Sequence, residues 1–352
     1  MSKKIMIVAG GTGGHIFPGI AVADYLKEQG WQVVWLGTAD RMEADVVPRH
    51  NIAIRYIDVK GVRGNGSMRL LKAPFMVIKA IWQARKVMKQ EKPDVLLGMG
   101  GYVTGPAGVA AKLLGIPLLI HEQNAVAGLS NKLLAKIANQ VMAAFPSAFE
   151  SDNCKIIGNP VRSSVANMQV EKMSAQCNVL VVGGSLGAKV FNDELPEVFK
   201  QLASESNLAI RHQTGKGHLA EVTTRYEKLS LNAEVNEFIH DMDKAYAWAD
   251  IVVCRAGALT VSEIAAAGKM AVFVPFPFAV DDHQTANANY LVKQNAALLI
   301  QQKNMTKESL VELLKPYVTD KALVIEMAEK AKAAAKLDAT RDVANLCIEF
   351  SK

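Results

Sequence analysis

The chain has 352 residues, of which 50% are hydrophobic and 21% are charged. This length is typical of two ordinary domains, and the composition excludes an intrinsically disordered chain. The four cysteines stand far apart with no C-x-x-C pair, which excludes a disulfide framework and favours a reducing compartment. The first apolar run breaks into glycines too early for a signal peptide, and no apolar run is long enough to span a bilayer. We therefore expect a soluble, cytoplasmic protein.

The net charge of +6 is unevenly distributed along the chain. Residues 1–160 carry 19 Lys and Arg against 11 Asp and Glu, hence +8, and the remaining residues carry 21 against 23, hence −2. The first half is therefore expected to meet an anionic surface or substrate. No helical pattern has a dense basic stripe and no aromatic–basic alternation occurs, so phosphates on a lipid or sugar carrier are expected and nucleic acid is not.

In the first half, short β-branched apolar runs alternate with longer helical patterns. The predicted strands are 5–9, 32–36, 54–59, 95–99, 118–121 and 140–143. Helices are predicted at 18–29, 74–90 and 106–114, each beginning at a proline, whose missing N–H group is not needed there. Alternating strands and helices predict a parallel sheet with helices on both faces.

The second half restarts the same pattern after a turn-rich stretch at 158–162. Its predicted strands are 178–182, 209–213, 233–238, 251–254, 271–274 and 297–300. We predict an α/β protein of two Rossmann-like, doubly wound domains, residues 1–160 and 161–340, with a helix in 341–352 returning to the first. Because ligands bind at the carboxyl ends of such sheets, the active site is expected in a cleft between the domains.

Three glycine-rich segments each connect a predicted strand to a helix. They are AGGTGGH at 9–15, GMGGYVTG at 98–105 and GGSLGA at 183–188. Backbone N–H groups and a helix N-terminus can bind phosphate oxygens there. Two segments in the first half predict one bound diphosphate, and the third predicts another. Ile16 replaces the last glycine of a dinucleotide fingerprint and no Walker A lysine occurs, which disfavours hydride transfer, although Asp40 keeps that alternative open.

Polar residues follow two of the first-half strands. His15 comes directly after the first glycine segment, where an imidazole could exchange a proton beside a phosphate site. The run from His121 to Asn124 follows the strand at 118–121 and could offer a carboxylate and amides to sugar hydroxyls. A structural histidine and an ordinary exposed loop are the alternatives.

Two loops of the second half carry polar residues as well. Glu263 could bind the vicinal hydroxyls of a ribose, or it could cap its own helix through the T-x-x-E spacing from Thr260. Gln284 and Asn287 suit neutral sugar hydroxyls. The acidic pairs at 241/243 and 281/282 lack a third oxygen ligand, so we expect neither a tightly bound metal nor a cofactor.

The helical pattern at 68–90 has an apolar stripe flanked by Arg69, Lys72 and Lys79. The stripe consists of Leu71, Phe75, Ile78 and Trp82. It is either a membrane-surface face or a core-facing stripe, which is the commoner meaning of such periodicity.

Several motifs taken together resemble the MurG-type N-acetylglucosamine transferases of peptidoglycan synthesis. In order they are AGGTGGHIFPG, LGTADRMEAD, GMGGYVTGP, HEQNAVAGL, GNPVR, VVGGSLGA and CRAGALTVSEIAAAG. The resemblance covers essentially the whole chain and implies the glycosyltransferase-B fold. It implies inverting transfer of N-acetylglucosamine from UDP-N-acetylglucosamine to the C4 hydroxyl of undecaprenyl-diphosphate-N-acetylmuramoyl pentapeptide, at the cytoplasmic face of the plasma membrane. An anionic membrane surface and other cell-wall synthesis and division proteins are the further partners it implies.

The resemblance also implies roles for particular residues. His15 is the expected base, with Glu122 as its rival or as the group that orients it. The acceptor diphosphate would meet Gly11, Gly100, Gly101 and Tyr102. The donor would meet Thr12, Gly13, Gly14, Asn124, Arg162, Ser185, Ile239, Ala258, Leu259, Thr260, Val261, Ser262, Glu263, Gln284 and Asn287. His283 stands where relatives often have a second glutamine before Gln284, so this chain departs from the family pattern at that position.

Three alternatives differ in chemistry. A UDP-N-acetylglucosamine 2-epimerase would need no acceptor, a non-catalytic UDP-sugar-binding membrane adaptor would show no turnover, and an NAD-dependent reductase would change nicotinamide absorbance.

Overall fold

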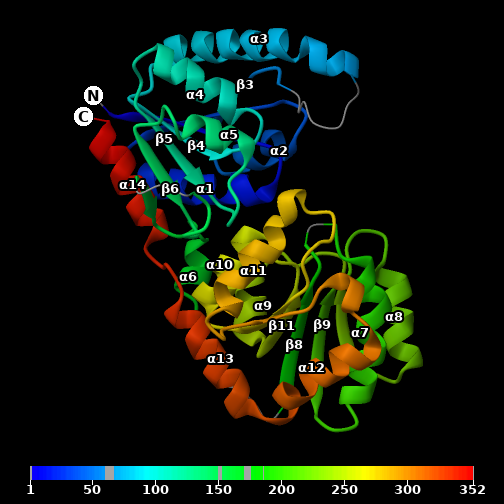
Figure 1. Ribbon diagram of the computed structural model, residues 1–352. Coiled ribbons are helices and arrows are strands. Elements are labelled where there is room, and N and C mark those ends of the chain that lie inside the picture. Colours follow the sequence, from blue (N-terminus) through cyan, green and yellow to red (C-terminus); the bar gives the residue numbers. More distant parts are fainter. Residues whose placement is uncertain (1, 60–66, 150–152, 170–175, 185, 352) are drawn as a thin grey trace. The chain divides into compact units, whose positions relative to one another are not determined.

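A computed structural model of the protein describes residues 2–59, 67–149, 153–169, 176–184 and 186–351, with residues 67–73 described by their backbone alone. The chain divides into two compact units. Unit 1 comprises Met1–Arg162 and Leu337–Lys352, and unit 2 comprises Ser163–Lys336. Each unit is built on its own parallel sheet (Figure 1).

The sheet of unit 1 has the order β3-β2-β1-β4-β5-β6-β7. Its strands are β1 (Lys4–Ala9), β2 (Gln32–Gly37), β3 (Ala53–Tyr56), β4 (Val95–Gly100), β5 (Leu118–Glu122), β6 (Gln140–Ala143) and β7 (Cys154–Ile156). Its helices are α1 (Gly13–Glu28), α2 (Met42–Arg49), α3 (Ser67–Glu91), α4 (Thr104–Leu113), α5 (Leu129–Leu134) and α14 (Ala339–Phe350). The strand order reverses direction between β1 and β4, and this switch point is where ligands bind in doubly wound sheets.

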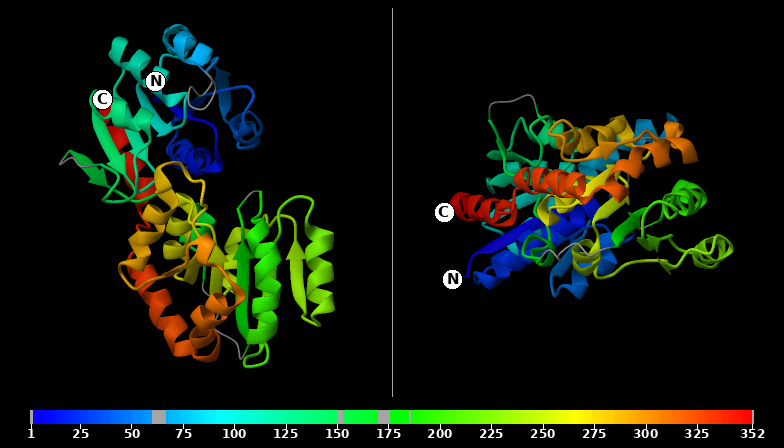
Figure 2. Two further views of the ribbon diagram at one scale, coloured as in Figure 1. Left: turned by 45° about the vertical axis from the view of Figure 1, so that its right-hand side comes forward. Right: turned by 90° about the horizontal axis from the view of Figure 1, so that it is seen from below.

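Side chains of β1 alternate between two hydrophobic cores, as the period of a strand requires. Ile5 and Ile7 pack on one face with α1 and α14, whereas Met6 and Val8 pack on the other face with α3 and α4. Helix α3 lies beside α4 (Figure 1). The chain ends both belong to unit 1 and lie near each other (Figure 2), and Lys3 Nζ donates to the Ser351 carbonyl.

Unit 2 repeats this plan with the order β10-β9-β8-β11-β12-β13. Its strands are β8 (Cys177–Val182), β9 (Leu208–Gln213), β10 (Ala233–Asn236), β11 (Ile251–Cys254), β12 (Met270–Phe273) and β13 (Leu298–Leu299). Its helices are α6 (Ser163–Ala166), α7 (Lys189–Leu202), α8 (Leu219–Lys228), α9 (Met242–Trp248), α10 (Ala258–Ala267), α11 (His283–Val292), α12 (Lys307–Thr319) and α13 (Lys321–Ala333). The switch point here lies between β8 and β11, and α7 and α12 cover one face.

The α/β fold class with two doubly wound sheets is confirmed. The predicted helix starts are wrong, because α1 and α3 begin five and seven residues before the prolines assigned to their first turns, at Gly13 and Ser67. Pro18 and Pro74 lie inside these helices, where each removes one backbone donor. Strand β7 was not predicted, since three residues, of which Cys154 is half-buried and the other two are exposed, carry little periodicity.

Candidate active site

The two glycine segments of unit 1 meet at the switch point between β1 and β4. Gly101 has φ +86°, and a Cβ atom there would lie 2.3 Å from the carbonyl oxygen of Gly10. Gly100 has φ +116°, and its Cβ would lie 2.8 Å from His15 Nδ1. Only glycine allows this backbone conformation and this close approach. The two loops and the imidazole of His15 therefore form one contiguous site.

Two buried side chains hold these loops in place. Thr104 Oγ1 donates to the Gly100 carbonyl at 2.7 Å and lies 3.2 Å from the Val8 carbonyl, so it ties β4 to β1. Glu43 accepts hydrogen bonds from Gly11 N at 3.0 Å and from Thr38 N and Oγ1 at 3.0 and 2.8 Å. A carboxylate with all its partners on neighbouring loops fixes their relative positions.

His15 is linked to the loop after β5 through Gln123. His15 Nδ1 lies 2.7 Å from Gln123 Oε1, and Gln123 Nε2 lies 3.0 Å from His121 Nδ1. His121 Nε2 lies 2.9 Å from the carbonyl oxygen of Gly158. Burial lowers the pKa of His121 to about 4, against the opposing effects of the Gly158 carbonyl and the Glu122 charge. The His121 ring is therefore neutral at physiological pH.

Glu122 has a different environment from the one expected of a base. Its Oε1 accepts from Asn124 N and Nδ2 at 3.0 and 3.2 Å, and its Oε2 accepts from Gly128 N and Asn131 Nδ2 at 3.0 and 2.9 Å. The residue is buried. Its hydrogen bonds shape the loop that carries Asn124, and His15 is held by Gln123 instead.

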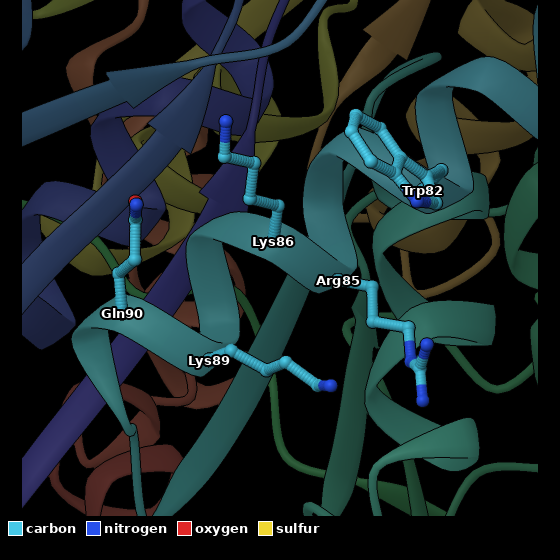
Figure 3. A pocket seen from close by; sticks show the side chains of 5 residues that line it. All are labelled: Trp82, Arg85, Lys86, Lys89 and Gln90. Atoms are coloured by element: carbon cyan, nitrogen blue, oxygen red, sulfur yellow. The ribbon is translucent and has the colours of Figure 1, made fainter.

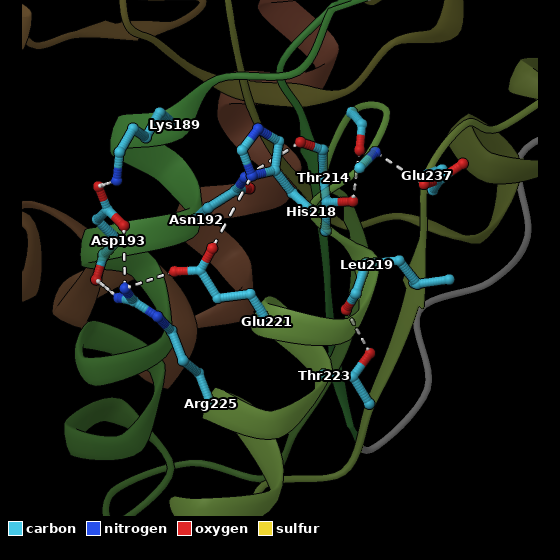
Figure 4. Close-up of polar contacts among 12 residues, drawn as sticks. Lys189, Asn192, Asp193, Thr214, His218, Leu219, Glu221, Thr223, Arg225 and Glu237 are labelled. Carbon is cyan, nitrogen blue, oxygen red and sulfur yellow. Dashed lines mark hydrogen bonds and ion pairs between the residues drawn. The ribbon is translucent and has the colours of Figure 1, made fainter.

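In unit 2, the glycine segment after β8 packs against the loop after β9. Gly187 has φ +74°, and a Cβ there would lie 2.2 Å from the Thr214 carbonyl oxygen. Asn192 Nδ2 on α7 donates to the same carbonyl at 3.1 Å (Figure 4). Gln213 Nε2 donates to the Gly184 carbonyl at 2.8 Å. Ser185 lies outside the described residues.

Helix α8 is joined to α7 by charged side chains beside this segment. Arg225 Nη2 lies 3.2 Å from Asp193 Oδ1 and 3.0 Å from Glu221 Oε1 (Figure 4). These half-exposed ion pairs add little stability.

The second switch-point loop of unit 2 leads from β11 into α10. The helix begins at Ala258 with Gly257 as its N-cap, so Thr260 lies inside the first turn and makes no capping box with Glu263. The capping alternative is therefore wrong. Only 3% of Glu263 is exposed, and Tyr246 Oη donates to its Oε2 at 3.3 Å. Leu259, Val261 and Ser262 lie in the same helix.

The segment before α11 has an unusual backbone. Asp281 and Asp282 both have positive φ, 52° and 47°, which is uncommon for residues other than glycine. Gln284 Oε1 accepts a hydrogen bond from Phe276 N at 2.8 Å. This bond fixes the side-chain amide of Gln284, with the oxygen toward Phe276 N and Nε2 on the other side. Asn287 is buried, and its Nδ2 donates to the Ala256 carbonyl.

The remaining predicted residues lie in several surroundings. Tyr102 is 56% exposed beside the second glycine segment, Arg162 stacks over the Phe17 ring at 6.0 Å, and Ile239 is half-buried after β10. Thr12 is the N-cap residue of α1, and Gly13 and Gly14 begin that helix. Within the described part of the chain, no three His, Cys, Asp or Glu side chains gather where they could hold a metal ion.

Helix α3 presents apolar side chains to solvent. Phe75, Ile78 and Trp82 are 77%, 63% and 63% exposed, which contradicts the core-facing alternative for these three residues. The side chain of Leu71 lies outside the described part. A shallow pocket follows along the helix, lined by Trp82, Arg85, Lys86, Lys89 and Gln90 (Figure 3). Lys86 Nζ lies 5.9 Å from the centre of the Trp82 ring. None of the described helices is both long enough and apolar enough to cross a membrane.

Three residues of this site were not singled out from the sequence: Glu43, Thr104 and Gln123. Gln123 lies within the polar run after β5, and Glu43 within the LGTADRMEAD motif. Their partners lie 108 and 32 residues away along the chain, so the sequence offers no local signal for their contacts.

Comparison with known proteins places this geometry among glycosyltransferases. Residues 5–143 match the glycosyltransferase family 28 N-terminal domain, and residues 178–343 match the corresponding C-terminal domain. The chain is 65% identical over 350 residues to a UDP-N-acetylglucosamine--N-acetylmuramyl-(pentapeptide) pyrophosphoryl-undecaprenol N-acetylglucosamine transferase of Pseudoalteromonas translucida (strain TAC 125), covering 99% of this chain and 98% of that protein. A protein of the same description from Psychromonas ingrahamii is 53% identical, covering 98% of each.

Solved structures agree with this. The crystal structure of Acinetobacter baumannii MurG is similar with a TM-score of 0.86 and 45% identity, covering 99% of both chains. A UDP-N-acetylglucosamine 2-epimerase structure has a TM-score of 0.69 at 15% identity, covering 99% of this chain and 97% of that one, a likeness of fold alone.

Proposed function

Since the chain belongs to the MurG-type N-acetylglucosamine transferases of glycosyltransferase family 28, we propose that it moves N-acetylglucosamine from UDP-N-acetylglucosamine to the C4 hydroxyl of undecaprenyl-diphosphate-N-acetylmuramoyl pentapeptide. The product is the lipid-linked disaccharide of peptidoglycan synthesis. The observation that carries the proposal is the full-length 65% identity together with His15 seated on two adjoining glycine loops.

Unit 1 is proposed to bind the acceptor. Gly11 N donates to Glu43 and Gly100 N donates to Thr104 Oγ1, so the backbone N–H groups of Gly101 and of the start of α1 are the donors proposed for the acceptor diphosphate. Tyr102 lies exposed beside them. The net charge of +8 on residues 1–160 favours the approach of this anionic group.

Unit 2 is proposed to bind the donor, with the glycine segment at 183–188 and the N-terminus of α10 against the UDP diphosphate. Ile239 would lie beside the uracil and Glu263 would take the ribose hydroxyls, which requires a carboxylate oxygen to become accessible on binding. Gln284 and Asn287 would meet the sugar. Thr12, Gly13, Gly14, Asn124 and Arg162 of unit 1 are further proposed donor contacts.

His15 is proposed as the general base. It takes the proton of the C4 hydroxyl while that oxygen attacks the anomeric carbon, and the bond to the β-phosphate oxygen of UDP breaks on the opposite face, so the configuration inverts. Backbone N–H groups and helix N-termini meet the charge of the leaving diphosphate. Glu122 is disfavoured as base because both of its oxygens already accept two hydrogen bonds each.

The α3 surface is proposed to rest on the cytoplasmic face of the plasma membrane. Exposed Phe75, Ile78 and Trp82, followed by Arg85, Lys86 and Lys89, combine an apolar area with cations that suit anionic lipid headgroups. Association with other cell-wall synthesis and division proteins, and hence roles in cell shape and division, would follow from that location.

One assay tests the activity. Labelled UDP-N-acetylglucosamine is incubated with and without a muramoyl-diphosphate lipid analogue, and the products are separated. We expect release of UDP only with the acceptor, and a labelled disaccharide lipid. Conversion of the sugar nucleotide without acceptor would indicate an epimerase, and donor binding without turnover would indicate an adaptor; either result would overturn the proposal.

A further inference from the structure

We propose that Gln123 and His121 are positioning residues that fix the tautomer of His15, with the proton on Nδ1 and the lone pair on Nε2. This inference rests on the proposed function and deepens it, because it names the atom that accepts the proton of the acceptor hydroxyl. The inference follows from three consecutive hydrogen bonds, which link Gly158 to His121, His121 to Gln123 and Gln123 to His15. In each of them, only one placement of the hydrogen is possible.

The first bond determines the tautomer of His121. Its Nε2 lies 2.9 Å from the Gly158 carbonyl oxygen, which can only accept, so Nε2 carries the hydrogen. The ring is completely buried and neutral, and a neutral imidazole has one N–H group. The Nδ1 atom of His121 is therefore an acceptor.

The second bond determines the orientation of the Gln123 amide. One end of this amide lies 3.0 Å from His121 Nδ1 and 3.1 Å from the His121 carbonyl oxygen. Both of these atoms are acceptors, so the NH2 group must face them. A flipped amide would place its oxygen against two acceptors and lose both bonds. The amide oxygen therefore faces His15.

The third bond determines the tautomer of His15. Gln123 Oε1 can only accept, so the His15 Nδ1 atom at 2.7 Å must carry the hydrogen. When the ring is neutral, its Nε2 has the lone pair, and no described residue forms a hydrogen bond with it. Gly100 also lies against the His15 ring, and a Cβ atom at this position would lie 2.8 Å from Nδ1. The chain from Gly158 to His15 thus leaves Nε2 ready to act as the base.

Nitrogen-15 NMR of the full-length protein, labelled at histidine, tests the tautomer without any substrate. At pH 8, His15 is identified by the signal lost in His15→Gln. Free histidine favours the Nε2–H form, so the expected Nδ1–H form of His15 differs from that of an unconstrained ring. Finding His15 predominantly as Nε2–H in the unmodified protein would overturn the inference.

Two variants separate positioning from folding. Gln123→Met removes the acceptor, and we expect His15 to return to Nε2–H and kcat to fall about 10²-fold, with KM for UDP-N-acetylglucosamine within about twofold. Gln123→Glu places an oxygen against the two acceptors of His121 and should lower Tm, but it keeps an acceptor for His15 and therefore keeps the Nδ1–H form and more of kcat than Gln123→Met.

Gln140→Met is the matched control, because Gln140 is a half-buried glutamine at the opposite end of the sheet whose Nε2 donates to the Val141 carbonyl. It should leave the His15 tautomer and kcat unchanged. A Gln123→Met protein that retains the Nδ1–H form, or that loses no more kcat than Gln140→Met, would contradict the inference. An unmodified protein that shows the Nδ1–H form but transfers no sugar would contradict the proposed function alone.

Discussion

At the residue scale, the site of unit 1 depends both on glycines, which have no side chain, and on the side chains that hold the glycine loops in place. Gly100 combines a left-handed backbone with the closest approach to His15, so both its conformation and its missing Cβ are needed. Glu43 and Thr104 then hold the two glycine loops in place by hydrogen bonds to Gly11 N and to the Gly100 carbonyl. Each of these residues acts on the position of His15 or of the loops.

Gly100→Ala should displace the His15 ring, because the new methyl group would lie 2.8 Å from Nδ1. We expect kcat of the transferase assay to fall by about 10²-fold. Gly115→Ala is the control: Gly115 also has a positive φ, 69°, but no atom lies within 4 Å of its Cβ position. It should cost about 1 kcal/mol of stability and leave kcat unchanged. Equal losses of kcat in the two variants would show that backbone strain, and not the contact with His15, lowers kcat, and would contradict the role given to Gly100.

Glu43→Gln should destabilise unit 1, because both carboxylate oxygens face only donors and the amide would turn an NH2 group toward them. The expected loss is about 1–3 kcal/mol in the free energy of unfolding, measured by denaturant titration. Glu329→Gln, on the exposed surface of α13, should change it by less than about 0.5 kcal/mol. A Glu43 variant as stable as the Glu329 variant would refute the role given to this carboxylate.

At the scale of elements, α3 is the helix whose surface the unit 1 core does not explain. Ala80, Ala84 and Met88 face the core, while Phe75, Ile78 and Trp82 remain exposed. A helix that buries one stripe of side chains and exposes large apolar side chains on another is expected to bind a second apolar surface.

Phe75→Asp with Ile78→Asp should weaken binding to anionic vesicles by at least about tenfold in cosedimentation, because two apolar contacts are replaced by charges of the same sign as the lipid. Turnover of a short-chain soluble acceptor should be spared. The control is Leu323→Asp with Ile325→Asp, two exposed apolar residues of α13. Vesicle binding that is unchanged in the α3 variant, or equally reduced in both, would reject the membrane face.

At the scale of the whole molecule, each unit contains, among its described residues, one buried histidine whose pKa is lowered by burial. Burial lowers the pKa of His121 to about 4 in unit 1 and that of His212, packed against Tyr226, to about 3 in unit 2. Because these folded-state pKa values lie below the ordinary value of 6.5, the unfolded chain binds more protons in between. Stability is therefore full above pH 6.5 and decreases as the pH falls toward 4.

At pH 5 each histidine should cost about 2 kcal/mol of stability relative to pH 7.5. Denaturant titrations at the two pH values check this, and His212→Gln should reduce the pH dependence of unit 2 while leaving that of unit 1. Asp250, whose pKa burial raises, acts in the opposite direction in both proteins and cancels in the comparison. A His212→Gln protein with an unchanged pH dependence would contradict the assignment.

Sequence alone determined the α/β class, the two sheets and the glycine segments at their switch points, because strand and helix periodicity and glycine turns are local properties. The family motifs also predict roles for His15 and for residues 258–263, and these roles stay predictions that the assays above test. Helix starts were predicted wrongly where a helix continues through a proline, as at Pro18 and Pro74.

Only the tertiary structure decided which partners these residues have. Gln123 holds His15 across 108 residues of chain, whereas Glu122, one position earlier, turns its carboxylate to Asn124 and Asn131. Successive side chains after a strand point in different directions, and which of them meets the imidazole depends on how β1, β4 and β5 pair. Such contacts are set by the packing of distant segments, so no pattern in the sequence could specify them.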